Sequence, residues 1–517
     1  MLSEDLATSF LPPSYMWSLT LFALCLSAIL MFPFLTGRRL SITHRKQGWR
    51  ISLVNTRGDF QNEAEQLIRM GFSKSPSAFR MSTDGGPRLI LSQKHLDAMS
   101  DDDHFNVAEA VKRDYLLDLF GFETAFHGTL HSEIVAPAVT AMTKKLVPLV
   151  PLMSKEAALG LEKEWTDNSE YHDVPLQPTL GGVVARLASL AFVGPDLCRN
   201  PTWLEITVSY TINRVIAVYV LRIFPSFLQP FVHWVLPPCR KLRAQIQQAR
   251  ELILPALKHE RQLQSAGNAK RDPNRPFSSL AWNDEYAAGR LYDPTVAQLR
   301  MIFVSIHTTI DMAVKVLVRL CEHPELIQPL REEIVTVCGE NGLTHSSLER
   351  LLLMDSLMKE TQRLEPASLA TIARYTHRKT TLSDGTIVPK GTQVVLPNMF
   401  MWNNESIYPD SNTFDAYRFL RMRDDPETAK LASFTRSSHI HTAFGHGKHT
   451  CPGRFFASDT IKIILCHILL KYDLQLCDGE APAKKRYGFA MYRDPDARIR
   501  VRRRGVEGVS EGILAGF

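Results

Sequence analysis

One stretch near the carboxyl end constrains this chain more than any other: FGHGKHTCPGRFFA, residues 444–457. It surrounds a single cysteine, Cys451, with glycines at positions 445, 447 and 453, and an apolar run follows it. Glycines let the backbone turn tightly and approach another group closely. A helix that begins just past Cys451 would point its free N–H groups and its dipole at the sulfur, which favours a thiolate. A thiolate in such a loop is a good iron ligand.

The composition places this loop in an ordinary globular chain. The 517 residues are 45% hydrophobic and 22% charged, which supplies ample material for a large core. The formal net charge of +6 is too small to argue for nucleic acid, and we expect no nucleic-acid partner. The eight cysteines are scattered without a CxxC pair, which indicates a reducing compartment and no disulfide framework.

The amino-terminal segment predicts a membrane anchor. No charged residue lies between Asp5 and Arg38, and residues 16–35 are almost wholly apolar, long enough for one bilayer-spanning helix. Basic residues follow the segment and acidic residues precede it, so the chain after about residue 37 should face the cytosol. A cleaved signal peptide would need a basic start and a shorter apolar core. We expect a luminal amino terminus and anchor helix over residues 1–37 and one cytosolic domain over 38–517.

Helices outweigh strands in the rest of the chain. Helical spacing dominates residues 130–365, and a turn, short strand and helix start are expected at 84–98. The apolar stretch 215–236 is interrupted by Arg222 and two prolines, and is expected at a membrane interface or in the core. The sequence therefore predicts a mainly α fold with minor β structure. Further expectations are helices over 242–264, 300–320 and 455–470, short strands within 372–397, a loop over 266–288 and an irregular region over 402–443.

The residues Phe444, Gly447, Cys451 and Gly453 fit the pattern F-x-x-G-x-x-x-C-x-G. This resembles the haem-binding loop of the cytochrome P-450 family, in the form found in fungal members. The resemblance covers nearly everything from residue 70 to 503 and implies the family's one-domain, mainly helical fold with a small β region. It implies that Cys451 is the axial thiolate of haem b iron. The residues it assigns to this cofactor are Cys451, His449, Phe444, Gly447, Gly453 and Arg374, with His449 and Arg374 near the propionates.

A zinc site is the alternative interpretation of this stretch. His439, His441, His446, His449 and Cys451 lie close together in the sequence, and their side chains are of zinc-ligand types. In an extended chain, however, His446 and His449 would point to opposite sides. Zinc also leaves the glycines and the apolar helix without a role, so the sequence favours iron.

A second pattern lies about 90 residues earlier, where Glu360 and Arg363 form E-x-x-R. This spacing places the two side chains on one face of a helix. The pair alone is weak, because such pairs are usually surface ion pairs. The segment FDAYRF, residues 414–419, resembles the family segment whose arginine joins this pair, so Arg418 is the expected third member. In the family, this triad is structural and holds the proximal side of the haem pocket.

The predicted central helix departs from the family pattern A/G-G-x-D/E-T-T. Here the matching residues are VSIHTT, residues 304–309, and Thr308 stands at the position of the oxygen-activating threonine. Its hydroxyl can donate a proton and relay protons for O–O cleavage. His307 replaces the acidic neighbour. His307 either serves this proton relay, because its ordinary pKa suits neutral pH, or is a helix histidine paired with a backbone or side-chain partner.

The resemblance implies a monooxygenase that takes electrons from NADPH through a cytochrome P-450 reductase and sits in the endoplasmic reticulum membrane. Residues 304–308, 368–372 and 489–491 are the implied pocket segments; they are mostly small or apolar, which suits a hydrophobic small molecule. Fungal relatives suggest a specialised metabolite of the terpenoid class, such as a diterpenoid, indole diterpene or meroterpenoid. A haem-thiolate isomerase or dehydratase that needs no reductase is the second hypothesis, and a membrane-tethered zinc or binding module is the third.

Overall fold

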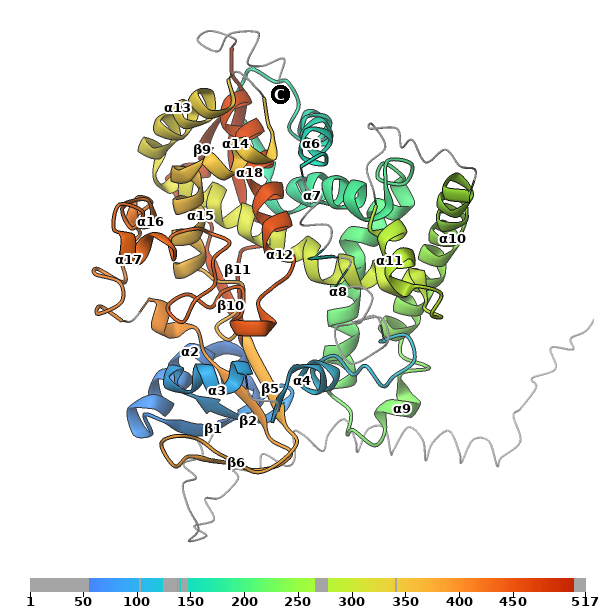
Figure 1. Ribbon diagram of the computed structural model, residues 1–517, viewed down its shortest axis with the longest axis vertical. Helices are drawn as coiled ribbons and strands as arrows, with labels where there is room; N and C mark the ends of the chain where they lie inside the picture. Colours follow the sequence, from blue (N-terminus) through green and yellow to red (C-terminus); the bar gives the residue numbers. More distant parts are fainter. Residues whose placement is uncertain are drawn as a thin grey trace, which may run out of the picture.

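A long helix, α12 (Pro294–Glu322), is the centre of the fold in this computed structural model (Figure 1). Asp293 caps it by accepting the backbone N–H groups of Thr295 and Val296, and Pro294 occupies its first position, where no N–H is needed. The helix packs against α7, α8, α10, α15 and α18. The structure describes residues 55–101, 104–123, 137, 139–140, 147–265, 278–339, 342–402 and 404–505.

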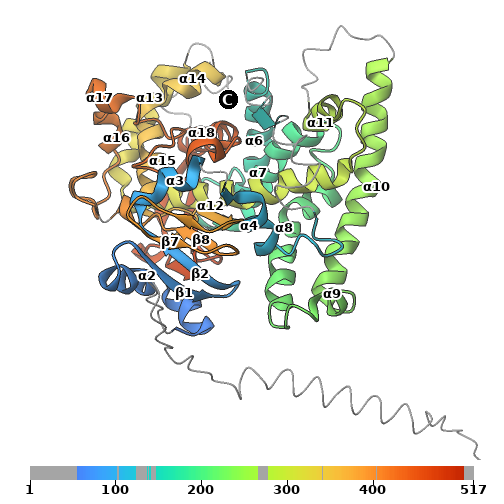
Figure 2. The same ribbon diagram turned by 60° about the horizontal axis from the view of Figure 1, so that its bottom comes forward.

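The helices form most of the molecule, as predicted, and one continuous apolar core runs between them. Figure 2 shows α8, α9 and α10 gathered on one side of α12 and α13, α15 and α18 on the other. Besides α12, the bounds are α2 Arg57–Lys74, α3 Leu96–Asp101, α4 Val107–Asp114, α6 Val150–Trp165, α7 Leu176–Val193, α8 Pro201–Leu221, α9 Gln229–Val232, α10 Pro237–Ser265, α11 Ser279–Ala287, α13 Ile327–Cys338, α14 His345–Arg350, α15 Leu352–Leu364, α16 Arg418–Arg421, α17 Pro426–Ala429 and α18 Arg454–Lys471.

The largest sheet has five strands, and α2 packs on its edge strand β1 (Figure 1). This sheet has the order β1-β2-β8-β5-β3; only β2 and β8 run parallel. The other sheets are β4-β12-β9 and the pairs β10-β11 and β6-β7. The bounds are β1 Ala78–Thr83, β2 Gly86–Leu91, β3 Phe105–Asn106, β4 His172–Pro175, β5 Ile372–Thr376, β6 Thr380–Thr381, β7 Ile387–Val388, β8 Gln393–Leu396, β9 Tyr472–Leu476, β10 Lys484–Tyr487, β11 Ala490–Arg493 and β12 Arg498–Arg503.

One local prediction was wrong, and a second was confirmed except for two single helical turns. The segment 266–288, expected to be a loop, contains helix α11, whose residues Leu280 and Trp282 are fully buried. The polar appearance of this segment hid the few apolar side chains that hold it to the core. The region 402–443, expected to be irregular, is irregular over most of its described residues; the exceptions are the short helices α16 and α17, and Phe419 of α16 is buried. Each is a single turn of helix, which is too short to produce a periodic pattern in the sequence.

Three described helices are long and apolar enough to cross a membrane by length and composition: α7, α8 and α12. The most apolar windows of α7 and α12 are 78% and 72% buried inside the protein, so their apolar character serves the core. The corresponding window of α8 is only half buried. The predicted anchor over residues 1–37 lies outside the described residues.

Candidate active site

Cys451 lies in a tight loop that ends where helix α18 begins. Its backbone N–H donates to the carbonyl of Phe444 at 2.8 Å, which closes the loop across seven residues. Gly453 is the N-terminal cap of α18, and the guanidinium of Arg454 donates to the Cys451 carbonyl at 2.7 Å. The helix therefore starts three residues past the cysteine, and its cap lies two residues past it, close to where the sequence predicted.

Two of the three loop glycines are required by the backbone. Gly445 and Gly447 have φ of +82° and +62°, in the left-handed region that favours glycine. A Cβ atom at Gly445 would also lie 2.9 Å from the carbonyl oxygen of His449. Gly453 differs, because its φ is −85° and a Cβ there would lie 4.0 Å from the Cys451 sulfur, an ordinary contact. Gly453 still lies in the turn that leads into α18, but its conformation is one that other residues also adopt.

Cys451 as a whole residue is partly exposed, whereas Cys198, Cys321 and most of the other described cysteines are buried. Burial by the surrounding protein raises its pKa, against the lowering effect of the backbone N–H groups of Gly453 and Arg454 and the charge of Arg454. The α18 N-terminus thus contributes to thiolate stability as predicted, but it does not outweigh burial. A metal ion on the sulfur would remove the proton outright.

Arg374, on strand β5, is a buried cation, 4% exposed. Its guanidinium donates to the backbone carbonyls of Met99 at 3.0 Å and Ala373 at 2.8 Å. Among the described residues no carboxylate pairs with it, and burial lowers its pKa to about 10. A buried guanidinium with only carbonyl partners is costly unless an anion completes its environment.

Phe444 packs edge-on against Phe434, with 5.2 Å between ring centroids, and contacts the main core. His449 ends the single 3-10 turn Gly447–His449, and its ring is partly buried. The histidines proposed as zinc ligands do not converge. His441 is buried and its Nε2 pairs with Gln362 at 3.0 Å, while His446 pairs with Asp97 at 3.5 Å. In the described part of the chain, no group of three His, Cys, Asp or Glu side chains could hold a metal.

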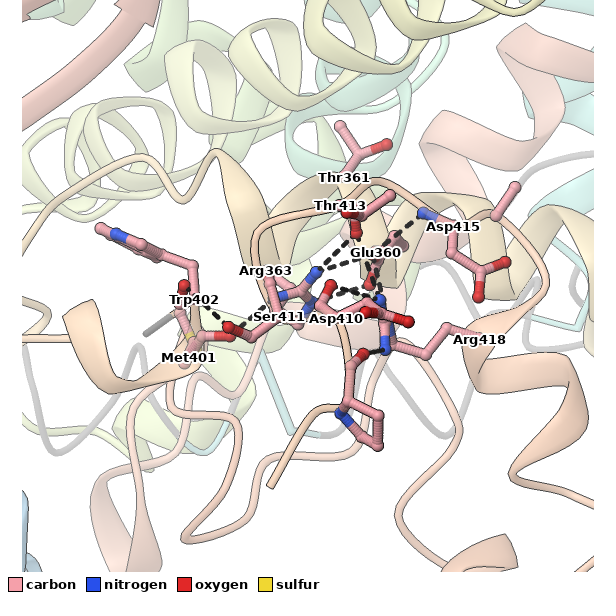
Figure 3. A network of polar contacts seen from close by, with 12 residues as sticks. Glu360, Thr361, Arg363, Met401, Trp402, Asp410, Ser411, Thr413, Asp415 and Arg418 are labelled. Carbon is pink, nitrogen blue, oxygen red and sulfur yellow. Dashed lines mark hydrogen bonds and ion pairs between the residues drawn. The ribbon is translucent and has the colours of Figure 1, made fainter. Parts of the chain in front are cut away.

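The structure brings Glu360, Arg363 and Arg418 together in a buried network (Figure 3). Arg363 donates two parallel hydrogen bonds to Glu360, both 2.7 Å, and Arg418 donates a third at 3.2 Å. The Glu360 and Arg363 side chains are fully buried, so an unpaired charge here would be strongly destabilising.

The rest of this network fixes loops that carry little secondary structure. The two arginines use their remaining N–H groups on backbone carbonyls, so one buried carboxylate organises a long irregular segment. The carbonyls are those of Met401, Ser411 and Thr413 for Arg363, and Pro409, Asp410 and Thr413 for Arg418.

One turn before Arg363 on the same helix, Lys359 is fully buried and donates to three carbonyls of the segment that leads to the cysteine loop. These are Leu431 at 2.7 Å, Ser433 at 2.6 Å and Arg436 at 3.0 Å. Burial lowers the pKa of Lys359 to about 7. Sequence reasoning missed this residue; a lysine at the end of the largely apolar stretch LLLMDSLMK, residues 351–359, was the available signal.

On α12, Thr308 is exposed although its neighbours Thr309 and Ile310 are buried. Its hydroxyl donates to the carbonyl of Val304 at 3.0 Å. The next residue back, His307, turns toward α8, where its Nε2 lies 2.8 Å from the Val208 carbonyl. Because a carbonyl only accepts, Nε2 carries the proton, and Nδ1 is the ring's acceptor. Burial lowers the pKa of His307, against the raising effect of Val208. This contact is the backbone partner that the second interpretation of His307 requires.

These features fit the thiolate-ligated haem that the resemblance implies. The partly exposed Cys451 sits at a helix N-terminus, the loop around it excludes side chains at Gly445, and the buried Arg374 has no anionic partner among the described residues. A propionate would supply that anion. Helices α12 and α18 pack against each other, so the Thr308 and Cys451 segments belong to neighbouring elements.

A second missed group is Lys315, which is buried on α12 beside Asp311. Its signal was a charged i,i+4 pair inside an apolar helix. No family motif includes Asp311 and Lys315, so the resemblance assigned them no role.

Comparison with known proteins gives a consistent result. The model of the family described as Cytochrome P450 matches residues 131–497. Fumitremorgin C monooxygenase of Neosartorya fischeri is 47% identical over 93% of this chain and 94% of its own length. Cytochrome P450 monooxygenase roqO of Penicillium rubens is 46% identical over 92% of this chain and 94% of its own length. Cytochrome P450 monooxygenase pyr9 of Aspergillus fumigatus is 40% identical over 94% of this chain and 96% of its own length.

Proposed function

The chain belongs to the cytochrome P450 family of monooxygenases, and we propose that it is a membrane-held haem-thiolate enzyme that hydroxylates a hydrophobic specialised metabolite. The observation that carries the proposal is the Cys451 loop. Cys451 lies just before the start of α18, where the backbone N–H groups of Gly453 and Arg454 lower its pKa, and the loop contains a backbone turn that only glycine adopts easily. The first two fungal relatives reported above are both named as monooxygenases.

In this proposal the sulfur of Cys451 would bind the iron of haem b, and Arg374 and His449 would bind its propionates. Arg374 is suited to this because it is buried and, within the described part of the chain, its hydrogen-bond partners are backbone carbonyls. When bound, the haem supplies dioxygen cleavage and transfer of one oxygen atom to the substrate, with electrons from NADPH through a reductase. Phe444, Gly447 and Gly453 shape the loop around the sulfur.

Thr308 is the proposed proton donor on the oxygen side. Its hydroxyl now donates to the Val304 carbonyl and can turn toward the exposed side of α12 by rotation about one bond. His307 remains a candidate for the same relay through Nδ1 only, because Nε2–H is committed to Val208. The Glu360–Arg363–Arg418 network holds the proximal segments in place and takes no part in proton transfer.

The substrate is proposed from the relatives. Two of the most similar ones are named for monooxygenation of fumitremorgin C, so this compound is the first candidate to test. The apolar character of residues 368–372 and 489–491 agrees with a bulky hydrophobic molecule, and fungal terpenoids form the second set of candidates.

A bilayer contact is proposed at two places. The first is the apolar segment before Arg38, which would cross the endoplasmic reticulum membrane once and leave the catalytic domain in the cytosol. The second is an exposed apolar surface around α9, here called the α9 patch. It consists of Ile223, Phe227, Phe231, Trp234 and Val235, of which the two phenylalanines are 70% and 71% exposed.

The test begins with haem ligation. The chain is reduced with dithionite and treated with carbon monoxide, and the difference spectrum is recorded. The red-shifted Soret band of thiolate ligation is expected, and Cys451→Ala should remove it while Cys477→Ala, the other partly exposed described cysteine, retains it. A band at the histidine position, or no haem band, contradicts the proposal.

Turnover then separates the reaction classes. The protein is incubated with a cytochrome P450 reductase, NADPH, oxygen and fumitremorgin C, and products are followed by mass spectrometry. A product heavier by one oxygen atom that requires both NADPH and oxygen supports a monooxygenase. Conversion of a substrate without NADPH would instead identify the isomerase or dehydratase alternative.

A further inference from the structure

A charged pair lies inside the otherwise apolar helix α12. The Lys315 side chain is 1% exposed, and its Nζ atom is 2.5 Å from Oδ2 of Asp311, one turn earlier. Burial raises the pKa of Asp311, against the lowering effect of Lys315. Burying an ammonium group is costly unless each of its donors has an acceptor. The acceptors of Lys315 therefore indicate which segments this side chain holds.

Each of the three donors of the Lys315 ammonium has an acceptor. Besides Asp311, Nζ donates to the carbonyl of Met491 at 2.9 Å and is 3.3 Å from the carbonyl of Pro366. Pro366 begins the segment that follows α15, and Met491 lies in strand β11. One side chain of the central helix therefore binds two segments that are distant from each other in the sequence.

The two segments are also bonded to each other. The N–H of Leu369 donates to the Phe489 carbonyl at 2.7 Å, and the N–H of Met491 donates to the Ala367 carbonyl at 3.1 Å. Farther along, the hydroxyl of Thr371 donates at 2.9 Å to the carbonyl of Thr442, which is two residues before Phe444. The joined pair, residues 366–371 and 489–491, thus extends from α12 to the start of the cysteine loop.

A second contact, one turn farther along α12, holds the same region. Arg319 lies 2.5 Å from Glu365, and Glu365 binds Arg493 of β11 at 2.6 Å. This outer contact ties the ends of both segments to α12 through side chains. Lys315 binds the backbone closer to Thr308, so its loss should leave the segments attached but free to shift.

Lys315 and Asp311 share a helix face with Thr308. Positions 304, 308, 311 and 315 are spaced by four, three and four residues, which places them in one stripe. We propose that Lys315, held by Asp311, is a positioning residue. It fixes where residues 366–371 and 489–491 stand relative to Thr308, and so determines how a bulky ligand is oriented in the site. The ligand part of this proposal rests on the proposed haem function.

The experiment uses three full-length, haem-loaded variants. The double variant Asp311→Leu/Lys315→Met removes both charges together, so no unpaired buried charge opposes folding. The single variant Asp311→Asn keeps the ammonium and a polar partner, and should act as a conservative rescue. Lys484→Met is the matched control, because it removes a half-exposed lysine that lies 3.2 Å from Glu365 and does not contact Lys315.

The affinity of each variant is measured by absorbance titration with two compounds that bind haem iron through nitrogen. These are imidazole, which is small, and the bulky azole clotrimazole. Imidazole is too small to need the distal segments. The double variant should bind clotrimazole about 10-fold more weakly because its binding surface is no longer pre-organised, and imidazole within about 2-fold of wild type, the scatter expected of such values. Asp311→Asn and Lys484→Met should stay near wild type for both. Equal effects on the two ligands, or none on clotrimazole, would overturn the proposal.

Hydrogen–deuterium exchange supplies a readout that does not depend on the ligand. In the double variant, peptides that cover residues 366–371 and 489–491 should exchange faster, while those that cover residues 352–364 should not. Faster exchange throughout the protein, or unchanged exchange in both segments, would contradict a positioning role. If the wild type lacks the thiolate band with carbon monoxide, the proposed function fails, and the exchange result still decides the role of Lys315.

Discussion

At the scale of single residues, the cysteine loop contains two glycines that look equivalent in the sequence but differ in backbone conformation. Gly445 has φ of +82°, and a Cβ there would lie 2.9 Å from the His449 carbonyl oxygen, whereas Gly453 has φ of −85° and open contact distances. The left-handed conformation costs a non-glycine residue about 1–2 kcal/mol before any clash is counted.

Gly445→Ala should therefore lower the thermal unfolding temperature and the haem content of purified protein, and Gly453→Ala should leave the unfolding temperature nearly unchanged. Thermal unfolding followed by circular dichroism measures the first quantity, and the ratio of Soret to protein absorbance measures the second. Equal losses in the two variants would show that backbone conformation does not distinguish these positions.

Thr308 and His307 are neighbours with different environments, one exposed and one bonded to Val208 at 2.8 Å. Loss of a general acid typically costs at least about 100-fold in rate. Thr308→Ala should reduce product formed per NADPH by about 10-fold or more, while Thr308→Ser retains most of it. His307→Gln keeps an N–H donor for Val208 and should retain activity within about 5-fold, because a typical intramolecular hydrogen bond contributes only about 1 kcal/mol net.

The measurement is product yield against NADPH consumed at several pH values. A large loss in His307→Gln, with a changed pH profile, would assign His307 to the proton relay and would contradict its role as a residue bonded to the backbone of α8.

At the scale of elements, the packing of α12 against α15 and β11 depends on buried charge. Glu365 lies between Arg319 and Arg493 and is almost fully buried. Burial raises the pKa of Glu365, but the charges of the two arginines and Lys484 lower it by a larger amount. Its pKa therefore lies below the ordinary value of 4.5. Such a carboxylate contributes stability above the unfolded-state pKa, and this contribution is lost as the pH falls through the folded-state pKa.

The free energy of unfolding of the wild type should therefore fall as the pH drops below about 4.5, the ordinary value for glutamate. In Glu365→Gln this fall should be shallower, although the variant is less stable at neutral pH. Urea unfolding at a series of pH values gives both curves. Asp118→Asn is the control, because Asp118 pairs with Lys112 at the surface and is 75% exposed. A Glu365→Gln curve parallel to that of the wild type would contradict the expected lowered pKa.

At the scale of the whole molecule, the α9 patch is the described surface most suited to a bilayer. Burying the two exposed phenylalanines in the interface would gain about 1.5–3 kcal/mol each if burial were complete. A chain that begins at residue 38 should still bind phospholipid vesicles, and Phe227→Ser/Phe231→Ser should weaken this binding by at least about 10-fold, since 1.4 kcal/mol corresponds to that factor.

Vesicle sedimentation measures this binding. Leu291→Ser is the matched control, because Leu291 is 90% exposed and lies outside the α9 patch. If the double variant binds as tightly as the shortened wild type, the patch does not face lipid and membrane contact rests on residues 1–37 alone.

The sequence by itself determined the parts of this protein that are encoded locally. The glycines around Cys451, the helix that begins at Arg454 and the pairing of Glu360 with Arg363 follow from backbone conformation and helical spacing over a few residues. These local patterns also carry the family resemblance, which the comparisons confirm. The minor strands and the long central helix were predicted for the same reason.

Only the tertiary structure decided the partners of polar groups buried far from their own segment. Lys315 bonds to carbonyls 51 and 176 residues away, and His307 to one 99 residues away. Arg374 is revealed as a buried cation only by the sheet that encloses it. Buried polar groups must find partners wherever the folded chain brings them. That choice depends on long-range packing, and no periodic pattern in the sequence records it.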